Sequence, residues 1–118
     1  MPAKLSTHVL DTAHGCPAQG MKIELWSLDG EERTLVTSAK TNADGRIDAL
    51  LLSADKMKAG QYEIVFFVGE YFASKTTALP KIHFLDKVPV RFGIGDAGAS
   101  YHVPLLCSPW SYSTYRGS

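Results

Sequence analysis

The feature that most constrains the fold of this chain is a hydrophobic repeat of two residues. Apolar side chains occupy every second position in short segments, and this spacing places them on one face of a β-strand. In residues 61–68, for example, Tyr62, Ile64, Phe66 and Val68 share one face. Such faces are buried by stacking one sheet on another. The repeat therefore predicts an all-β fold.

The same pattern recurs between turn signals along most of the chain. We expect strands at residues 5–12, 21–26, 34–37, 46–52, 61–68, 88–94, 101–107 and 110–115. Gly-rich and Pro-rich turns separate them, including the Asp44-Gly45 pair. Short strands at this spacing are typical of a two-sheet sandwich or a barrel.

Residues 70–75 break the alternation and predict one short helix. Glu70 would lie in its first turn and Lys75 in its last turn, as the helix dipole favours. Tyr71 and Phe72 would dock this helix on the sandwich.

Length and charge narrow the classes of function. The 118 residues contain no linker or internal repeat, so we expect a single domain over residues 1–118. The 12 basic and 12 acidic residues cancel. Nucleic acid and anionic membranes are therefore unfavourable partners, because both require a basic face. A net charge near zero permits self-association.

The N-terminal sequence and the cysteines indicate a compartment. Residues 1–5 lead at once into the first patterned segment and leave no room for a signal peptide, and no run is long enough to cross a bilayer. Cys16 and Cys107 are too few for a secreted disulfide framework. They fit two free thiols, or a single bridge. We expect a cytoplasmic protein.

Histidines are the first candidates for chemistry, because the sequence contains no metal motif and no phosphate loop. His8 and His102 lie opposite the main apolar set of their strands, so both should project from an outer sheet face. Each fits either a satisfied core or interface histidine or a proton acceptor near neutral pH. His14, in a turn, and His83, in a loop, are expected to be ordinary surface residues.

Arg46 and the C-terminus are the other candidates. Arg46 opens segment 46–52 directly after the Asp-Gly turn. It fits a surface arginine, or a fixed guanidinium for an anionic or carbonyl-rich ligand. The chain ends on Tyr115-Arg116-Gly117-Ser118, which has the composition of a binding surface. A frayed end is the alternative.

Four motifs together resemble the 5-hydroxyisourate hydrolases, the transthyretin-like proteins of urate breakdown. They are the opening LSTHVLD at 5–11, the turn NADGR at 42–46, the strand YHVPLL at 101–106 and the ending YRGS at 115–118. Residues 69–72 also resemble the short helix of that family. The motifs occur in order and at both ends, so the resemblance covers nearly the whole chain.

The resemblance implies a transthyretin-like sandwich of two four-stranded sheets with one short helix. It also implies a homotetramer, a dimer of dimers, with active sites in the channel between dimers. The implied reaction is hydrolysis of 5-hydroxyisourate to 2-oxo-4-hydroxy-4-carboxy-5-ureidoimidazoline in purine degradation. Water attacks a ring carbonyl and the adjacent C–N bond opens, with no metal or other cofactor.

The resemblance also implies roles for individual residues. His8 would act as the base, while His102 would position the water or share its proton. Arg46 would hold the substrate and its developing negative charge. The ending would close the pocket, with substrate-binding roles for Tyr115 and Arg116 and a hydroxyl donor at Ser118.

Two other functions remain open at this point. A carrier could bind an aromatic hormone in the same channel, but it would need an open channel with apolar walls. His8, Arg46, His102 and the ending would crowd such a channel with polar groups. If the chain were an interaction module without catalytic activity, every matching motif would have to be a coincidence.

Overall fold

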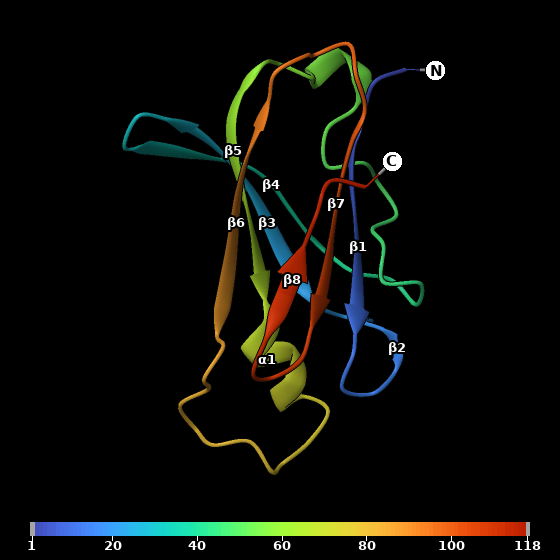
Figure 1. The fold of residues 1–118 in the computed structure, drawn as a ribbon, viewed down its shortest axis with the longest axis vertical. Coiled ribbons are helices and arrows are strands. Elements are labelled where there is room, and N and C mark those ends of the chain that lie inside the picture. The colour runs from blue at the N-terminus through green and yellow to red at the C-terminus, as the bar shows by residue number, and fades with distance from the viewer. Residues whose placement is uncertain (1, 118) are drawn as a thin grey trace.

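The computed structural model describes residues 2–117 and contains two stacked four-stranded sheets, as the family resemblance implies (Figure 1). One sheet has the order β2-β1-β7-β8 and the other β4-β3-β5-β6. The strands are β1 (Leu5–Asp11), β2 (Cys16–Pro17), β3 (Lys22–Asp29), β4 (Glu32–Lys40), β5 (Gly60–Phe67), β6 (Lys87–Ile94), β7 (Tyr101–Cys107) and β8 (Tyr112–Thr114). A short helix, α1 (Val68–Ala73), follows β5, and a 3-10 turn spans Ala54–Lys56.

Strands β1 and β7 join the two ends of the chain. They pair in parallel with a register that runs from Leu5 opposite Tyr101 to Asp11 opposite Cys107. Seven consecutive residues of each strand take part, so every second side chain of both strands faces outward together. This pair forms the middle of its sheet and carries both histidines predicted to face outward.

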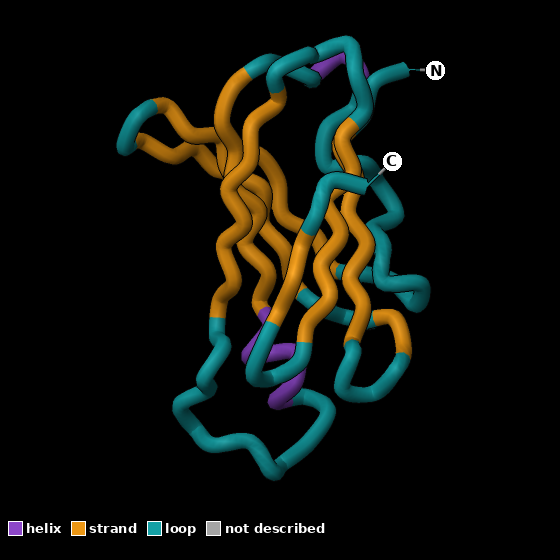
Figure 2. Tube along the Cα trace, viewed as in Figure 1, coloured by secondary structure: helices purple, strands orange, loops and turns teal. Residues whose placement is uncertain are grey.

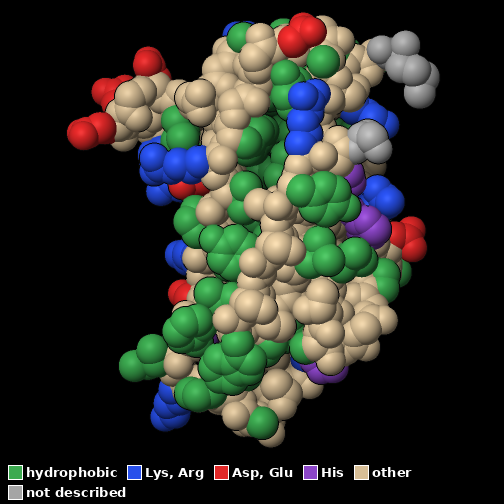
Figure 3. Space-filling model, viewed as in Figure 1, with side chains coloured by type: hydrophobic (Ala, Val, Ile, Leu, Met, Phe, Trp, Pro, Cys, Tyr) green, Lys and Arg blue, Asp and Glu red, His purple; other side chains and the backbone are tan. Residues whose placement is uncertain are grey.

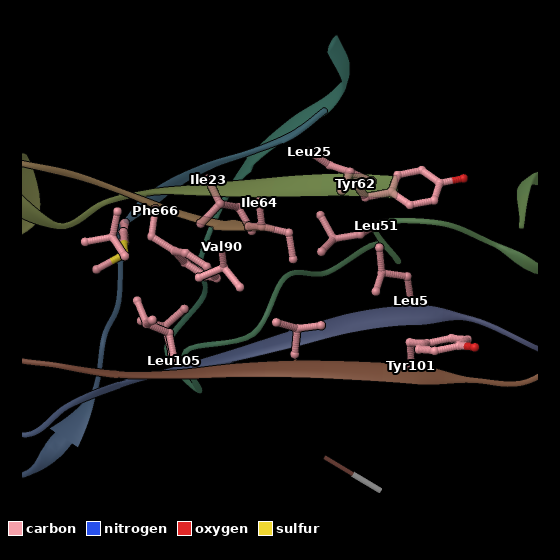
Figure 4. Close-up of a cluster of buried hydrophobic side chains, with 14 of the residues drawn as sticks. Leu5, Ile23, Leu25, Leu51, Tyr62, Ile64, Phe66, Val90, Tyr101 and Leu105 are labelled. Atoms are coloured by element: carbon pink, nitrogen blue, oxygen red, sulfur yellow. The ribbon is translucent and has the colours of Figure 1, made fainter. Parts of the chain in front are cut away.

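The core lies between the sheets and is filled by the inward-facing residues of both (Figure 4). Removing one such aliphatic or aromatic side chain from water stabilises the fold by roughly 1.5–3 kcal/mol. The alternation predicted from the sequence is confirmed at these positions. Side chains with no exposed surface include Leu5, Val9, Ile23, Leu25, Ile64, Phe66 and Leu105.

The predicted strand at 46–52 is wrong. This segment belongs to the irregular stretch between β4 and β5 (Figure 2) and contacts β1 only at separated points. Leu5 exchanges two backbone hydrogen bonds with it, donating to Leu52 O at 3.0 Å and accepting from Leu51 N at 3.1 Å. Leu51 and Leu52 are both buried although they are consecutive. An extended strand would send them to opposite faces, so the backbone bends instead.

Other boundaries differ where pairing partners decide them. The segment predicted at 34–37 grows into β4, because pairing with β3 continues through polar residues. The last strand shortens, because β8 pairs only with residues 105–107 of β7. Strand β2 was not predicted, since two residues are too short for any periodicity.

Helix α1 begins two residues before its predicted start and docks through Tyr71 and Phe72, as expected. The Tyr71 hydroxyl donates to Asp11 Oδ2 at 2.7 Å. Burial acts to raise the pKa of Asp11, but hydrogen bonds from Tyr71 and His14 outweigh it and hold that pKa below its usual range. His14 therefore has more than the surface role expected of it. Its Nδ1 lies 2.7 Å from Asp11 Oδ2, and its ring stacks on Phe72.

Both cysteines are free thiols, so the bridge that the sequence left open is not formed. Cys16 is exposed, whereas Cys107 is buried. Burial and the nearby Asp11 raise the pKa of Cys107 to about 12. Within residues 2–117, no helix has the length and apolar character needed to cross a membrane.

Candidate functional site

A hollow on the outer face of the β1–β7 pair brings several polar side chains together. Its volume is about 250 Å³. It opens on the side of the sheet that faces away from the core, where alternate residues of β1 and β7 project. The lining residues are Lys4, Ser6, Arg46, Ser100, Tyr101 and His102.

His102 lies at one wall of this hollow. Its Nδ1 is 2.8 Å from the Ser6 hydroxyl, on the residue that pairs with it in the strand register. Burial lowers the pKa of the His102 ring, and the nearby Arg46, His8 and Lys4 lower it further. The ring is therefore favoured in its neutral form, which has one nitrogen that can accept a proton.

His8 projects from β1 two residues after Ser6, on the same outward face. Its Nε2 lies 2.9 Å from the backbone oxygen of Asp44. A carbonyl oxygen only accepts hydrogen bonds, so the neutral ring carries its proton on Nε2. The lone pair of His8 is therefore on Nδ1. The prediction that both histidines face outward is confirmed, and the structure adds that their strands are adjacent.

Arg46 reaches the hollow from a tight turn and does not open a strand, contrary to the sequence prediction. The side-chain oxygen of Asn42 accepts hydrogen bonds from the backbone nitrogens of Asp44 and Arg46, at 2.9 and 3.1 Å. This is the way an Asn side chain closes a turn on its own backbone. The turn thus holds the Arg46 guanidinium and the carbonyl that binds His8.

Gly45 attaches this turn to β1. Its carbonyl accepts a hydrogen bond from Val9 N at 2.8 Å. Its φ is +75°, and a Cβ atom there would collide with the backbone oxygen of Val9. Only glycine combines this left-handed conformation with so close an approach.

The C-terminal segment returns to His102. Gly117 N donates to His102 O at 2.7 Å, so residue 117 forms an antiparallel bridge with β7. A Cβ on Gly117 would lie 2.6 Å from Cδ2 of the His102 ring. The ending thus packs closely against the histidine. Ser118, expected as a hydroxyl donor, lies outside the described residues.

Tyr115 and Arg116 do not line this hollow; they line a separate pocket of about 400 Å³ beside β6, which shares Tyr101 with the hollow. The Arg116 guanidinium stacks over the Tyr101 ring at 4.2 Å and donates to Ser100 O at 3.3 Å. The Tyr101 hydroxyl accepts from two backbone nitrogens of the β6–β7 loop, which fixes that ring. The side chain of Tyr115 is open to solvent in this chain, with the residue 60 % exposed.

The structure therefore brings Arg46, His102 and residue 117 to one place, with His8 beside them on the same face. Sequence reasoning missed Ser6 and Lys4 as lining residues. The alternation that placed His8 outward also places Ser6 outward, so that signal was present. Lys4 precedes the first patterned segment, and no periodicity marks it.

The electrostatic character of the hollow suits a small, polar, electron-rich ligand. Lys4, Arg46 and Arg116 contribute positive charge around it. The two imidazoles each keep one nitrogen free of the hydrogen bonds described above. Within the described residues, no group of three His, Cys, Asp or Glu side chains is arranged to hold a metal ion.

Comparison with known proteins matches residues 5–117 to the model of the HIUase/Transthyretin family. The chain is 54 % identical to 5-hydroxyisourate hydrolase 2 of Rhizobium meliloti over 98 % of its own length and 96 % of the relative. The structure of Klebsiella pneumoniae 5-hydroxyisourate hydrolase is similar, with a TM-score of 0.80, 34 % identity, and coverage of 98 % and 99 % of the two chains.

A transthyretin from sea bream, solved in complex with thyroxine, also has a similar structure. Its TM-score is 0.86 at 25 % identity, with coverage of 98 % of this chain and 95 % of that chain. The family match spans nearly all of the sequence, and the strand order and outward histidines described above agree with the expected sandwich. The chain belongs to the HIUase/Transthyretin family.

Proposed function

We propose that this protein hydrolyses 5-hydroxyisourate in purine degradation. One observation carries the proposal. His102, which is favoured in its neutral form, and the Arg46 guanidinium line the same outward-facing hollow, and His8 lies beside them. The high identity to a relative named 5-hydroxyisourate hydrolase supports the same activity. Hydrolysis of a cyclic amide needs a proton acceptor for water and a cationic or hydrogen-bonding group for the oxyanion.

His8 is the proposed general base. Its Nδ1 lone pair accepts a proton from water as the water oxygen attacks a ring carbonyl carbon of the substrate. The Asp44 carbonyl holds the opposite edge of the imidazole, so the ring keeps the required tautomer during attack. The same histidine then returns the proton to the ring nitrogen when the C–N bond breaks.

His102 and Arg46 complete the reaction. The free nitrogen of His102 orients the water or shares its proton. The Arg46 guanidinium, held by its turn, binds the substrate and stabilises the negative charge that develops on the carbonyl oxygen. Substrate contacts from Tyr115 and Arg116, which line the adjoining pocket, and a hydroxyl donor at Ser118 are part of the proposal.

A hormone carrier is the second candidate, because the sea bream transthyretin solved with thyroxine shares the fold. A carrier channel needs apolar walls, whereas this hollow is lined by Lys4, Arg46 and His102. The polar lining favours hydrolysis. Fold similarity by itself does not choose between them.

We further propose that the chain assembles as a homotetramer, a dimer of dimers, in the cytoplasm. Strand β8 is an edge strand with all three residues exposed, and β6 is the neighbouring edge of the other sheet. Unpaired edges of this kind pair readily with a second copy. The free thiols fit a reducing compartment.

The direct test is the decay of freshly generated 5-hydroxyisourate, followed by ultraviolet absorbance. The purified protein should accelerate the decay, and Arg46→Ala should reduce kcat/KM by about 100-fold or more, as loss of a transition-state donor does. Thyroxine binding by calorimetry is the parallel measurement. Decay at the spontaneous rate together with tight thyroxine binding would replace the hydrolase with the carrier.

A further inference from the structure

Among residues 2–117, Ser6 is the one side chain that the structure bonds to the ring of His102. The two residues are 96 positions apart in sequence and meet because β1 and β7 pair in parallel with Ser6 opposite His102. The Oγ–Nδ1 distance is 2.8 Å, and the pair is partly buried. The sequence patterns predicted no role for Ser6.

The hydrogen bond at Nδ1 decides which nitrogen of the neutral His102 ring carries the lone pair and can act as a base. A neutral imidazole has one N–H and one lone pair. When Nδ1–H donates to the Ser6 hydroxyl, the lone pair is on Nε2, the atom of the ring farther from the backbone. When the hydroxyl donates instead, Nε2 carries the proton and cannot accept another.

The surroundings of His102 favour the first arrangement once a proton is taken up. Protonated imidazole has two N–H groups, so Nδ1 must then donate, and a hydroxyl oxygen is able to accept. Arg46, His8 and Lys4 oppose a positive charge on the ring, whereas a hydrogen bond to the backbone of Ser6 acts in the opposite direction. Within residues 2–117, no carboxylate is among the groups that shift the pKa of His102. The Ser6 hydroxyl is therefore a neutral group that supports both protonation states.

We propose that Ser6 is a positioning residue: its hydroxyl accepts the Nδ1–H of His102 and keeps Nε2 as the nitrogen that orients water and exchanges its proton in the hollow. The inference rests on the proposed function for its catalytic consequence, but the tautomer itself does not depend on substrate. Two different acceptors thus set the two histidines. The Asp44 carbonyl leaves Nδ1 of His8 free, and the Ser6 hydroxyl leaves Nε2 of His102 free.

The first test measures the tautomer in the wild-type protein without substrate. Nitrogen-15 chemical shifts of the His102 ring, recorded above its pKa, should show Nδ1 protonated and Nε2 bare. In Ser6→Ala the ring should become a mixture of both tautomers. A wild-type ring protonated on Nε2 would overturn the proposal, whether or not the protein is a hydrolase.

The second test measures catalysis in Ser6→Ala and Ser6→Thr. Loss of a group that orients a working imidazole lowers activity by about 10- to 100-fold in comparable sites. We expect that loss in kcat for Ser6→Ala, with KM changed by less than about twofold, since the Ser6 hydroxyl is engaged with His102. Ser6→Thr restores the hydroxyl and should recover kcat to within about threefold of wild type.

Ser38→Ala is the matched control. It removes an exposed hydroxyl from β4 in the other sheet and should leave kcat and the His102 tautomer unchanged. Melting temperatures of all variants establish that they fold. Full kcat in a folded Ser6→Ala protein, or an equal loss in Ser6→Thr, would contradict the proposal. An inactive wild-type protein with the expected tautomer would instead contradict the proposed function.

Discussion

At the scale of single residues, contacts with the backbone determine the surroundings of His8 and His102. Gly117 donates to the carbonyl of His102 and lies so close to its ring that a Cβ atom on residue 117 would collide with it. The sequence showed that this glycine belongs to a family ending. It did not show that the missing side chain is what allows the ending to reach the histidine.

Gly117→Ala should therefore impair catalysis more than folding. The added methyl group would meet His102 Cδ2 at 2.6 Å, so either the ring or the C-terminal segment must move. We expect kcat to fall by about 10-fold or more, as small misplacements of catalytic groups do. The melting temperature should change little, because the segment is terminal.

Gly95→Ala is the control for this change, because nothing lies within 4 Å of a Cβ at that position. It should leave kcat unchanged. If Gly117→Ala retained full kcat, the close packing of the ending against His102 would have no catalytic importance.

The titration of His102 is the second property at this scale. Burial lowers the pKa of this ring from its ordinary 6.5, and Arg46, His8 and Lys4 act in the same direction. The folded chain thus binds this proton less tightly than the unfolded chain. The resulting stability is complete above about pH 6.5 and is lost as the pH falls through that value and below it. The neutral form of His102 should therefore persist below pH 6.5.

Arg46→Gln should raise the pKa of His102, because it removes one of the positive charges that oppose protonation. The pKa is measured by nuclear magnetic resonance titration of the His102 ring. Lys75→Gln, which removes a cation beyond the end of α1, should leave it unchanged. A His102 pKa that does not rise in Arg46→Gln would show that the guanidinium acts elsewhere.

At the scale of elements, the turn at residues 42–46 is the part that assembles the site. It is closed by the Asn42 side chain and attached to β1 through the carbonyl of Gly45. It carries Arg46 and the Asp44 carbonyl that binds His8. The segment after the turn, which was predicted as a strand, is irregular and returns to β1 at Leu5 through Leu51 and Leu52.

Gly45→Ala should both destabilise the protein and disrupt the site. Glycine is lost from a position with φ of +75°, and the new Cβ would collide with the Val9 carbonyl. Strained backbone of this kind costs about 1–3 kcal/mol, and the collision adds to it. We expect a lower free energy of unfolding in urea and a large loss of kcat/KM.

Gly30→Ala is the control that measures the cost of the left-handed backbone conformation without a collision. Gly30 also has a left-handed φ, +62°, but nothing lies within 4 Å of a Cβ there. It should lose only about 1 kcal/mol, with kcat/KM unchanged. Equal destabilisation by the two substitutions would mean that the contact with Val9 is unimportant.

At the scale of the whole molecule, an apolar patch lies at one end of the sandwich. We define it by Ile82, Phe84 and Trp110, which are 90 %, 73 % and 57 % exposed. Figure 3 shows hydrophobic side chains gathered at this end, where α1 and the loop after it lie. The patch adjoins the exposed start of β8. Exposed apolar groups together with a free edge strand are typical of a surface that another chain covers.

Phe84→Asp should weaken the proposed assembly, because it places a charge in the centre of this patch. We expect a smaller mass by light scattering at low micromolar concentration and a loss of activity that parallels it. Leu35→Asp changes an exposed apolar residue on β4 and should leave the mass unchanged. A wild-type chain that is already a monomer would remove the tetramer from the proposal.

The sequence by itself determined the all-β fold, the outward direction of His8 and His102, and the docking of α1 through Tyr71 and Phe72. These properties follow from periodicity, which is local and can be seen within one strand or one helical turn. The motifs at both ends also determined the family, because each is a short run of neighbouring residues.

Only the tertiary structure decided how the site is assembled. The parallel pairing of β1 with β7 brings Ser6 to His102 across 96 positions, and the irregular segment brings Arg46 to the same face. Pairing partners, tautomers and close approaches depend on atoms far apart in sequence. No local pattern encodes them, and folding alone places them at hydrogen-bonding distance.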